Sequence, residues 1–344
     1  MIHKYVDTFL IKDYVNNLIN RKNDHKIGWV VPKASPYKCV MASTRIRVYD
    51  IVNYINTHST GICSCLYRKY SSYDIVVFQK VFRKRYHDLA AFLKGKNVKV
   101  VYDININDVP IKIANSSAIV DHHANEDIRR MVSLADSVIA SSKHLCDVYK
   151  EYNDNVVLIE ESIPKYFFEF FKEHTERNII KLIYCGYAIK AWEIKPIADV
   201  LNKINAKQIE LILICDHDPK LDFINYKYIH YNFSKLPEIL LRGDICIAPR
   251  DVTVGYNLGH AFTKIGYPMS VGLNVLASPV PSYEGSPAIL CDSVGEWESN
   301  LNELITNVDK RKFLARIGRE YCLENYSLDV IGEKYLEYFN KIIN

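Results

Sequence analysis

Residues 244–285 constrain the fold more than any other part of the chain. Ile245 to Ala248 form a short apolar run that Pro249 ends, and a second apolar run, 274–277, is followed by Ser-Pro and Pro-Ser turn signals. Between them lie a polar loop and a helical segment that Gly272 ends. The pattern predicts a strand–loop–helix–strand unit. Its loop and helix N-terminus lie at the carboxyl edge of a parallel sheet, where ligands of open α/β sheets bind and where phosphate is favoured.

Short apolar runs alternate with helical segments twice along the chain, which predicts an α/β protein with two Rossmann-like domains. The first set of predicted strands comprises residues 27–31, 74–78, 98–103, 137–140 and 156–159, and the second comprises 179–185, 210–214, 226–231, 245–248 and 274–277. Residues 160–178 contain an aromatic run and break this rhythm. We therefore expect domains at 1–165 and 175–325, a cleft between them, and a C-terminal helix, 327–344, packed on the first.

Composition describes an ordinary globular protein of 344 residues, 49% hydrophobic and 24% charged. Its net charge of +4 is too small to favour nucleic acid as a partner. The nine cysteines are scattered, several within apolar runs, as in a reduced cytoplasmic chain, and the Cys63-x-Cys65 pair lacks a second pair at zinc spacing. No apolar run approaches the length of a membrane span. We expect a cytoplasmic protein without a metal, and contact with the inner face of a membrane stays open.

The first 21 residues have a helical period, with Ile2, Val6, Leu10, Tyr14 and Leu18 on one line. This stripe predicts a helix that packs on the first domain through those side chains. The alternative is a helix that contacts a membrane surface or a partner.

A polar loop follows the first predicted strand and carries Ser43, Thr44, Arg45 and Arg47. Ser43 or Thr44 can cap a helix that runs to about residue 56. Two arginines beside a helix N-terminus at the carboxyl edge of a sheet favour an anion site, whereas the simpler interpretation is a capped helix with solvated arginines.

The residues of 244–285 resemble the donor-binding signature of GT-B glycosyltransferases, in particular the retaining, nucleotide-sugar-dependent group similar to glycosyltransferase family 4. The matching positions are Asp244, Pro249, Lys264, Met269, Gly272, Val275 and Ser278. The chain departs from the signature at both acids of the usual Glu-x7-Glu motif. The ribose-binding Glu falls on Tyr267, and its earlier partner falls on Gly259, beside His260.

The resemblance implies transfer of a sugar from a nucleotide-sugar donor to a saccharide or lipid-linked acceptor, with retention and without a bound metal or other cofactor. The negative charge that develops on the diphosphate would then be met by cations and backbone N–H groups. Gly186 and Lys190 match the glycine turn and basic residue that meet the diphosphate in the resembling enzymes. The donor residues implied are Gly186, Tyr187, Lys190, Arg250, Asp251, Thr263, Lys264 and Tyr267.

The acceptor side is expected in the first domain. The candidates are Ser43, Thr44, Arg45, Arg47, Lys80, Asp103, Asp121 and His122. Adjacent histidines, here His122 and His123, diverge on a strand, which argues against a metal there. His122 is instead a candidate hydrogen-bond donor or proton acceptor, or else Asp121 caps a helix beside one buried and one exposed histidine.

Arg45, His122 and Lys264 are the candidate catalytic residues. The competing hypothesis is a non-catalytic GT-B module that serves as a partner or scaffold. Loss of both motif acids supports the module, whereas retention of converging cations supports the enzyme.

Overall fold

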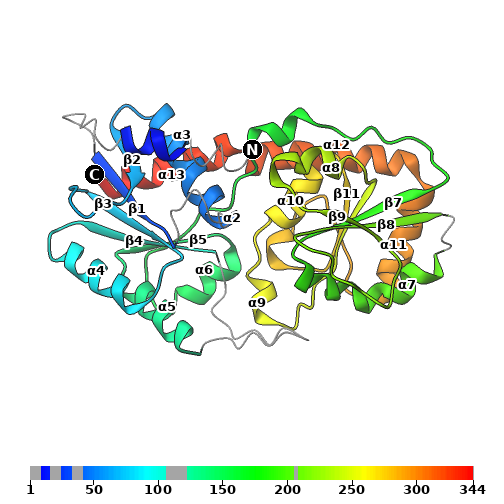
Figure 1. Cartoon of the computed structure of the whole chain (residues 1–344), viewed down its shortest axis with the longest axis horizontal. Coiled ribbons are helices and arrows are strands. Elements are labelled where there is room, and N and C mark those ends of the chain that lie inside the picture. The colour runs from blue at the N-terminus through cyan, green and yellow to red at the C-terminus, as the bar shows by residue number, and fades with distance from the viewer. Residues whose placement is uncertain (1–8, 16–24, 33–41, 106–121, 205–207, 344) are drawn as a thin grey trace. The chain divides into compact units, whose positions relative to one another are not determined.

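The computed structural model describes residues 9–15, 25–32, 42–105, 122–204 and 208–343 of the chain (Figure 1). The chain folds into two compact units. The first consists of residues 1–162 with 328–344, and the second of residues 163–327. The division therefore falls just before Ile163, and residues 163–178 belong to the second unit.

The first unit contains a six-stranded sheet in which every pairing is parallel, in the order β2-β1-β3-β4-β5-β6. Its strands are β1 (His25–Val30), β2 (Ile62–Leu66), β3 (Ile75–Gln79), β4 (Lys99–Ile104), β5 (Ser137–Ala140) and β6 (Val156–Leu158). Its helices are α2 (Ala42–Thr44), the π-helical turn η1 (Arg45–Tyr49), α3 (Asp50–His58), α4 (Lys84–Lys94), α5 (His122–Leu134), α6 (Lys143–Tyr149) and α13 (Leu328–Ile343). The strand order reverses between β1 and β3.

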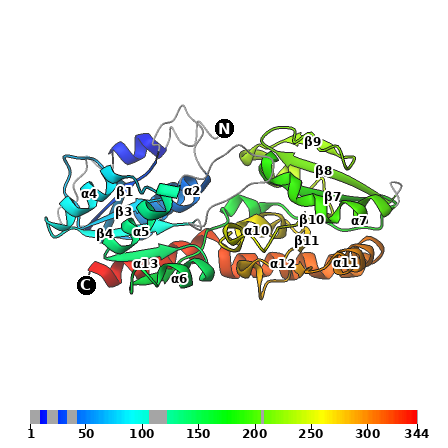
Figure 2. The same ribbon diagram turned by 90° about the horizontal axis from the view of Figure 1, so that it is seen from below.

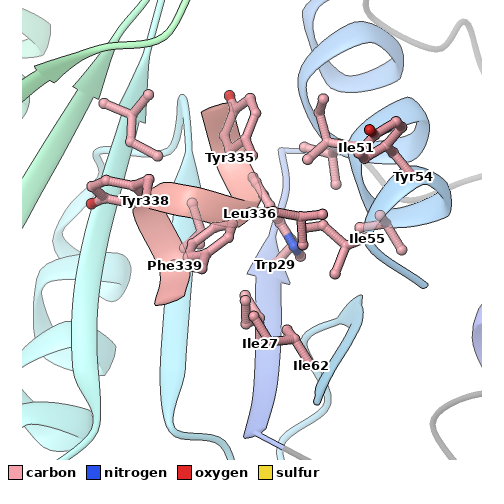
Figure 3. Close-up of a cluster of buried hydrophobic side chains, with 14 of the residues drawn as sticks. Ile27, Trp29, Ile51, Tyr54, Ile55, Ile62, Tyr335, Leu336, Tyr338 and Phe339 are labelled. Atoms are coloured by element: carbon pink, nitrogen blue, oxygen red, sulfur yellow. The ribbon is translucent and has the colours of Figure 1, made fainter. Parts of the chain in front are cut away.

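The last helix, α13, forms part of the core of the first unit. Figure 3 shows Tyr335, Leu336 and Phe339 packed over Trp29 of β1, with residues of α3 beside them. The rings of Trp29 and Phe339 meet edge to face with centroids 6.0 Å apart. Burying each such side chain contributes about 1.5–3 kcal/mol to the free energy of unfolding, which explains why the C-terminal segment folds back onto this unit.

The second unit repeats the architecture with a parallel sheet in the order β12-β11-β10-β7-β8-β9 (Figures 1 and 2). Its strands are β7 (Ile180–Cys185), β8 (Ile209–Cys215), β9 (Lys227–His230), β10 (Ile245–Ala248), β11 (Asn274–Ala277) and β12 (Ile289–Leu290). Its helical segments are η2 (Lys165–Glu169), η3 (Ala188–Ile197), α7 (Ala198–Lys203), η4 (Phe233–Lys235), α8 (Leu236–Leu240), α9 (Gly255–Leu258), α10 (Thr263–Ser270), η5 (Pro281–Tyr283), α11 (Val294–Thr306) and α12 (Val308–Tyr326). The strand order reverses between β7 and β10, as in the dinucleotide-binding fold.

The two Rossmann-like sheets predicted from the sequence are confirmed, and β5, β10 and β11 have the predicted bounds. Gly272 ends α10 in the left-handed conformation, with φ +81, as the stop signal predicts. Two strands, β2 and β12, were not predicted, because one is rich in Cys and Ser and the other has only two residues.

The prediction that Tyr14 packs inward is wrong. Residues 9–15 are helical, but Tyr14 is 53% exposed, whereas Phe9 and Asp13 are buried. The Asp13 carboxylate accepts the backbone N–H of Leu66 at 2.6 Å and pairs with Arg68 at 3.3 Å. Because these contacts satisfy the buried carboxylate, the helix packs through a face that includes a charged residue, which a hydrophobic period does not reveal.

Candidate functional site

The candidate site lies where the second sheet reverses its strand order. Gly186 comes directly after the last residue of β7. Arg250 lies two residues after the last residue of β10. Open α/β sheets bind their ligands at such a point. A Cβ atom at Gly186 would lie 2.7 Å from Lys264 Nζ and 3.1 Å from the Tyr184 hydroxyl, so a side chain there would require the lysine ammonium group to move. The glycine turn therefore admits a lysine side chain against the backbone.

Lys264 lies in the first turn of α10 and points back to the end of β7. Its ammonium group donates a hydrogen bond to the Cys185 carbonyl and lies 4.2 Å from the centre of the Tyr184 ring. Burial, and then the charge of Arg250, lower the pKa of Lys264 to about 8. Within the described residues, no carboxylate forms an ion pair with this lysine. The contacts of the Lys264 ammonium group therefore compensate only in part for the hydration that it loses in the fold.

Arg250 is the second cation of the site and is more deeply buried, with a side chain only 3% exposed. It forms an ion pair with Glu193 of η3, and Asn257 donates a hydrogen bond of 3.0 Å to the other carboxylate oxygen of Glu193. Arg250 Nε and the Tyr184 hydroxyl are buried and make no hydrogen bond to any group in the described part of the chain. The Glu193 carboxylate thus lies near two cations, Arg250 and Lys264. The Arg250 Nε and Tyr184 hydroxyl donors are also available, so the site is suited to an anion with several oxygens.

Lys190 and His260 form the outer part of the site. Lys190 Nζ lies 2.9 Å from His260 Nε2 and 4.4 Å from the centre of the Tyr256 ring. Burial, and then the charges of Arg250, Lys190 and Lys264, hold the pKa of His260 well below its usual value. The imidazole is therefore neutral at physiological pH and accepts a hydrogen bond from the ammonium group of Lys190. Lys190 is thereby held toward the same edge of the sheet.

The remaining predicted donor residues differ in their surroundings. Thr263 is buried at the start of α10, whereas Tyr187 is exposed beside Gly186. Asp251 is exposed, and its carboxylate accepts hydrogen bonds from the backbone and hydroxyl of Thr253. Tyr267 stacks on Phe167 with ring centroids 4.6 Å apart and meets Phe233 edge to face. An aromatic cluster thus occupies the position at which the resembling enzymes carry an acid.

In the first unit, the predicted helix cap is wrong. Ser43 and Thr44 are buried inside a continuous helical stretch, 42–58, and the Thr44 hydroxyl donates to the Gln79 side chain at 3.2 Å. Arg45 is buried in the π-helical turn that follows. Such turns are frequent at functional sites, so the structure leaves Arg45 a candidate.

Arg47 and Asp103 bind each other rather than facing solvent. The guanidinium donates to both carboxylate oxygens at 2.7 and 2.8 Å and to the Ile159 carbonyl at 3.1 Å, and the Tyr335 hydroxyl donates to the same carboxylate at 2.9 Å. Both side chains are fully buried. Because the charges of Arg47 and Asp103 neutralise each other, the geometry does not support ligand binding by either residue. Their role is structural, since the hydrogen bond from Tyr335 connects α13 to the sheet.

Lys80 follows β3 at the point of strand-order reversal in the first sheet. It has a left-handed backbone with φ +54, its N–H donates to the Asp103 carbonyl, and burial lowers its pKa. Strained backbone of this kind is common at binding sites. Asp121 lies outside the described residues. His122 begins α5, and its side chain also lies outside the description.

Sequence reasoning thus placed Gly186, Lys190, Arg250 and Lys264 in one site but missed two of their partners. Glu193 follows an aromatic residue in a 3-10 helix, and no spacing pattern connects it to Arg250. The position of His260 beside Gly259 was the only signal for its role. In the described part of the chain, no three His, Cys, Asp or Glu side chains form a group that could hold a metal ion.

Comparison with solved structures finds the same overall fold in several glycosyltransferases. A glycosyltransferase from Rickettsia africae superposes with a TM-score of 0.65 and 13% identity over 94% of this chain and 99% of its own. HepE of Anabaena, solved with UDP and glucose, has a TM-score of 0.62 and 13% identity over 92% and 99% of the two chains. A UDP-forming trehalose-phosphate synthase from Burkholderia xenovorans has a TM-score of 0.53 and 10% identity over 77% and 73%.

The fold is therefore the GT-B fold of glycosyltransferases, with two Rossmann-like domains. A scan of protein-family models and a search of curated protein sequences find no match for the chain. The likeness to known proteins thus resides in the architecture.

Proposed function

We propose that the chain is a glycosyltransferase that moves a sugar from a nucleotide-sugar to a saccharide or lipid-linked acceptor. The observation that carries this proposal is the pair of cations, half-buried Lys264 and buried Arg250, at the strand-order reversal of a GT-B donor domain. A nucleotide-sugar presents a diphosphate whose charge grows as the glycosidic bond breaks. Preorganised cations that meet this charge stabilise the transition state more than the ground state.

The proposal extends to metal independence and retention of configuration. Lys190, Arg250 and Lys264 supply three positive charges at one sheet edge, a role that a divalent cation has in other transferases. Retention follows from the resemblance of the 244–285 signature to retaining enzymes. HepE was solved with UDP and glucose, which makes UDP the first nucleotide to test.

Calorimetric titration with UDP in the presence of a chelator tests donor binding. We expect binding without a divalent cation, and at a ligand concentration of about a hundred times Kd the folded state gains about 2.7 kcal/mol. Lys264→Met should abolish the binding. Lys227→Met is the matched control, because Lys227 belongs to the same sheet but is exposed and paired with Glu210. If neither UDP nor other nucleoside diphosphates bind, the donor site is refuted.

One observation favours a second hypothesis, a GT-B module without catalysis. Tyr267 stacks on Phe167 where the resembling enzymes hold the ribose with a carboxylate. A module would bind the nucleotide or a partner and release no sugar. Release of UDP from UDP-sugars over a panel of acceptors distinguishes the two, because transfer requires turnover and a module shows binding alone.

A further inference from the structure

The short helix of residues 9–15 presents an apolar face to solvent. Phe9 stacks on Tyr49 with ring centroids 4.2 Å apart, and Asp13 binds the backbone of Leu66, so these two contacts fix the inward face. Ile11, Tyr14 and Val15, spaced i, i+3 and i+4, lie on the opposite face and are all exposed. Figure 2 shows the helix in dark blue on the outer side of the first unit.

A neighbouring loop extends this face with an aromatic residue and cations. The Arg68 guanidinium lies 5.0 Å from the centre of the Tyr14 ring, which joins the loop to the helix. Tyr70 is 94% exposed, and the ammonium group of Lys69 lies 5.8 Å from the centre of its ring. Lys12 is exposed on the helix itself. We call Ile11, Lys12, Tyr14, Val15, Arg68, Lys69 and Tyr70 the N-terminal patch.

The exposed charged residues of the N-terminal patch are all basic. Asp13, the acidic residue of the described helix, is buried beneath the patch and pairs with Arg68. Apolar side chains and tyrosines between lysines and arginines are typical of surfaces that enter the headgroup region of a bilayer. None of the described helices is long and apolar enough to cross a membrane. A surface of this kind lies on a bilayer and does not span it.

From this geometry we propose that the N-terminal patch docks the protein on an anionic lipid bilayer. Ile11, Tyr14 and Val15 enter the interface, and Tyr70 anchors the loop at headgroup level. Lys12 and Lys69 meet the negative surface, where each basic residue strengthens binding about fivefold, whereas the charge of Arg68 is balanced by Asp13. The inference does not depend on nucleotide binding, because the patch belongs to the first unit and the candidate donor site to the second.

Co-sedimentation with vesicles tests the proposal on the full chain without nucleotide. Vesicles of phosphatidylcholine alone are compared with vesicles that also contain phosphatidylglycerol. We expect at least tenfold stronger partitioning onto the anionic vesicles, weakened by high salt. Ile11→Asp with Val15→Asp should reduce partitioning at least tenfold. Lys12→Gln with Lys69→Gln should reduce it about fivefold per residue on anionic vesicles alone.

Phe313→Asp is the control, because Phe313 is equally exposed but belongs to α12 of the second unit, and this variant should partition like the parent. Circular dichroism and the thermal unfolding transition of each variant, both measured without nucleotide, check that it is folded. Equal partitioning onto both vesicles, or aspartate variants that sediment like the parent, would overturn the proposal. Self-association of the parent without vesicles, lost in the same aspartate variants, would also overturn it and assign the patch to a second copy of the chain.

Discussion

Replacement of Lys264 by Met should stabilise the protein and abolish diphosphate binding. Burial, and then the charge of Arg250, lower the pKa of Lys264 from 10.5 to about 8. A lowered lysine pKa means that folding favours the neutral amine, so the charged form at pH 7 costs stability. The difference between the two pKa values corresponds to about 3 kcal/mol. Loss of the hydrogen bond to Cys185 offsets about 1 kcal/mol of this.

The net gain expected from Lys264→Met at pH 7 is therefore about 2 kcal/mol, which raises Tm of the second unit by a few degrees. The sign depends on pH. Above the unfolded pKa of 10.5 the parent lysine is neutral in both states, and its penalty grows as the pH falls through 10.5 to about 8. The advantage of the variant should thus be complete at pH 7 and smaller at pH 9.5.

Scanning calorimetry at both pH values measures this difference, and titration with UDP measures binding. Lys227→Met should change neither quantity appreciably. A Lys264→Met protein that is less stable than the parent at pH 7 would show that the lysine is a structural element. The argument that the protein maintains a poorly compensated cation for a ligand would then be refuted.

Three further outcomes are expected. Between pH 7 and pH 9, Kd for UDP measured by titration should rise about tenfold, because Lys264 loses its proton near pH 8 and binding requires the charge; a flat profile would contradict this. Gly186→Ala should weaken UDP binding, because its Cβ would lie 2.7 Å from Lys264 Nζ, and a normal Kd would show that the turn gives way. Arg47→Met should lower the free energy of unfolding of the first unit, measured by urea denaturation, by about 3–5 kcal/mol, because the buried Asp103 carboxylate then keeps only the hydrogen bond from the Tyr335 hydroxyl. The double variant Arg47→Met with Asp103→Leu should recover much of this loss. Equal losses in the single and double variants would contradict the pairing.

Periodicity in the sequence was sufficient for the fold, because both sheets are parallel and buried on two faces. Their strands are near-continuous apolar runs that end at polar or turn residues, so β5, β10 and β11 could be delimited from the sequence. The same rule failed for β2, in which Ser64 and Cys65 are also buried. It failed for the helix of residues 9–15, because the burial of Asp13 depends on contacts with Leu66 and Arg68, more than fifty positions away.

Electrostatic partners were harder to predict than the cations themselves. Arg47 and Arg250 are both arginines that the sequence places at the carboxyl edge of a predicted sheet, and no pattern in the sequence distinguishes their roles. In the structure Arg47 is bound by both oxygens of Asp103, whereas Arg250 keeps a buried Nε without a hydrogen bond to the described residues. Whether a buried charge is structural or available depends on the number of acceptor oxygens around it, and that number comes from tertiary contacts.

The missing acids of the donor signature acquire a physical interpretation from these contacts. A carboxylate near Lys190 would neutralise part of the positive field, whereas His260 is a neutral acceptor that orients the lysine without cancelling its charge. The histidine stays neutral because burial, and then three surrounding cations, lower its pKa. The site therefore keeps its positive potential at the cost of stability. A module selected for packing alone would gain stability from an apolar residue at 264, so the uncompensated charge favours a ligand that carries the opposite one.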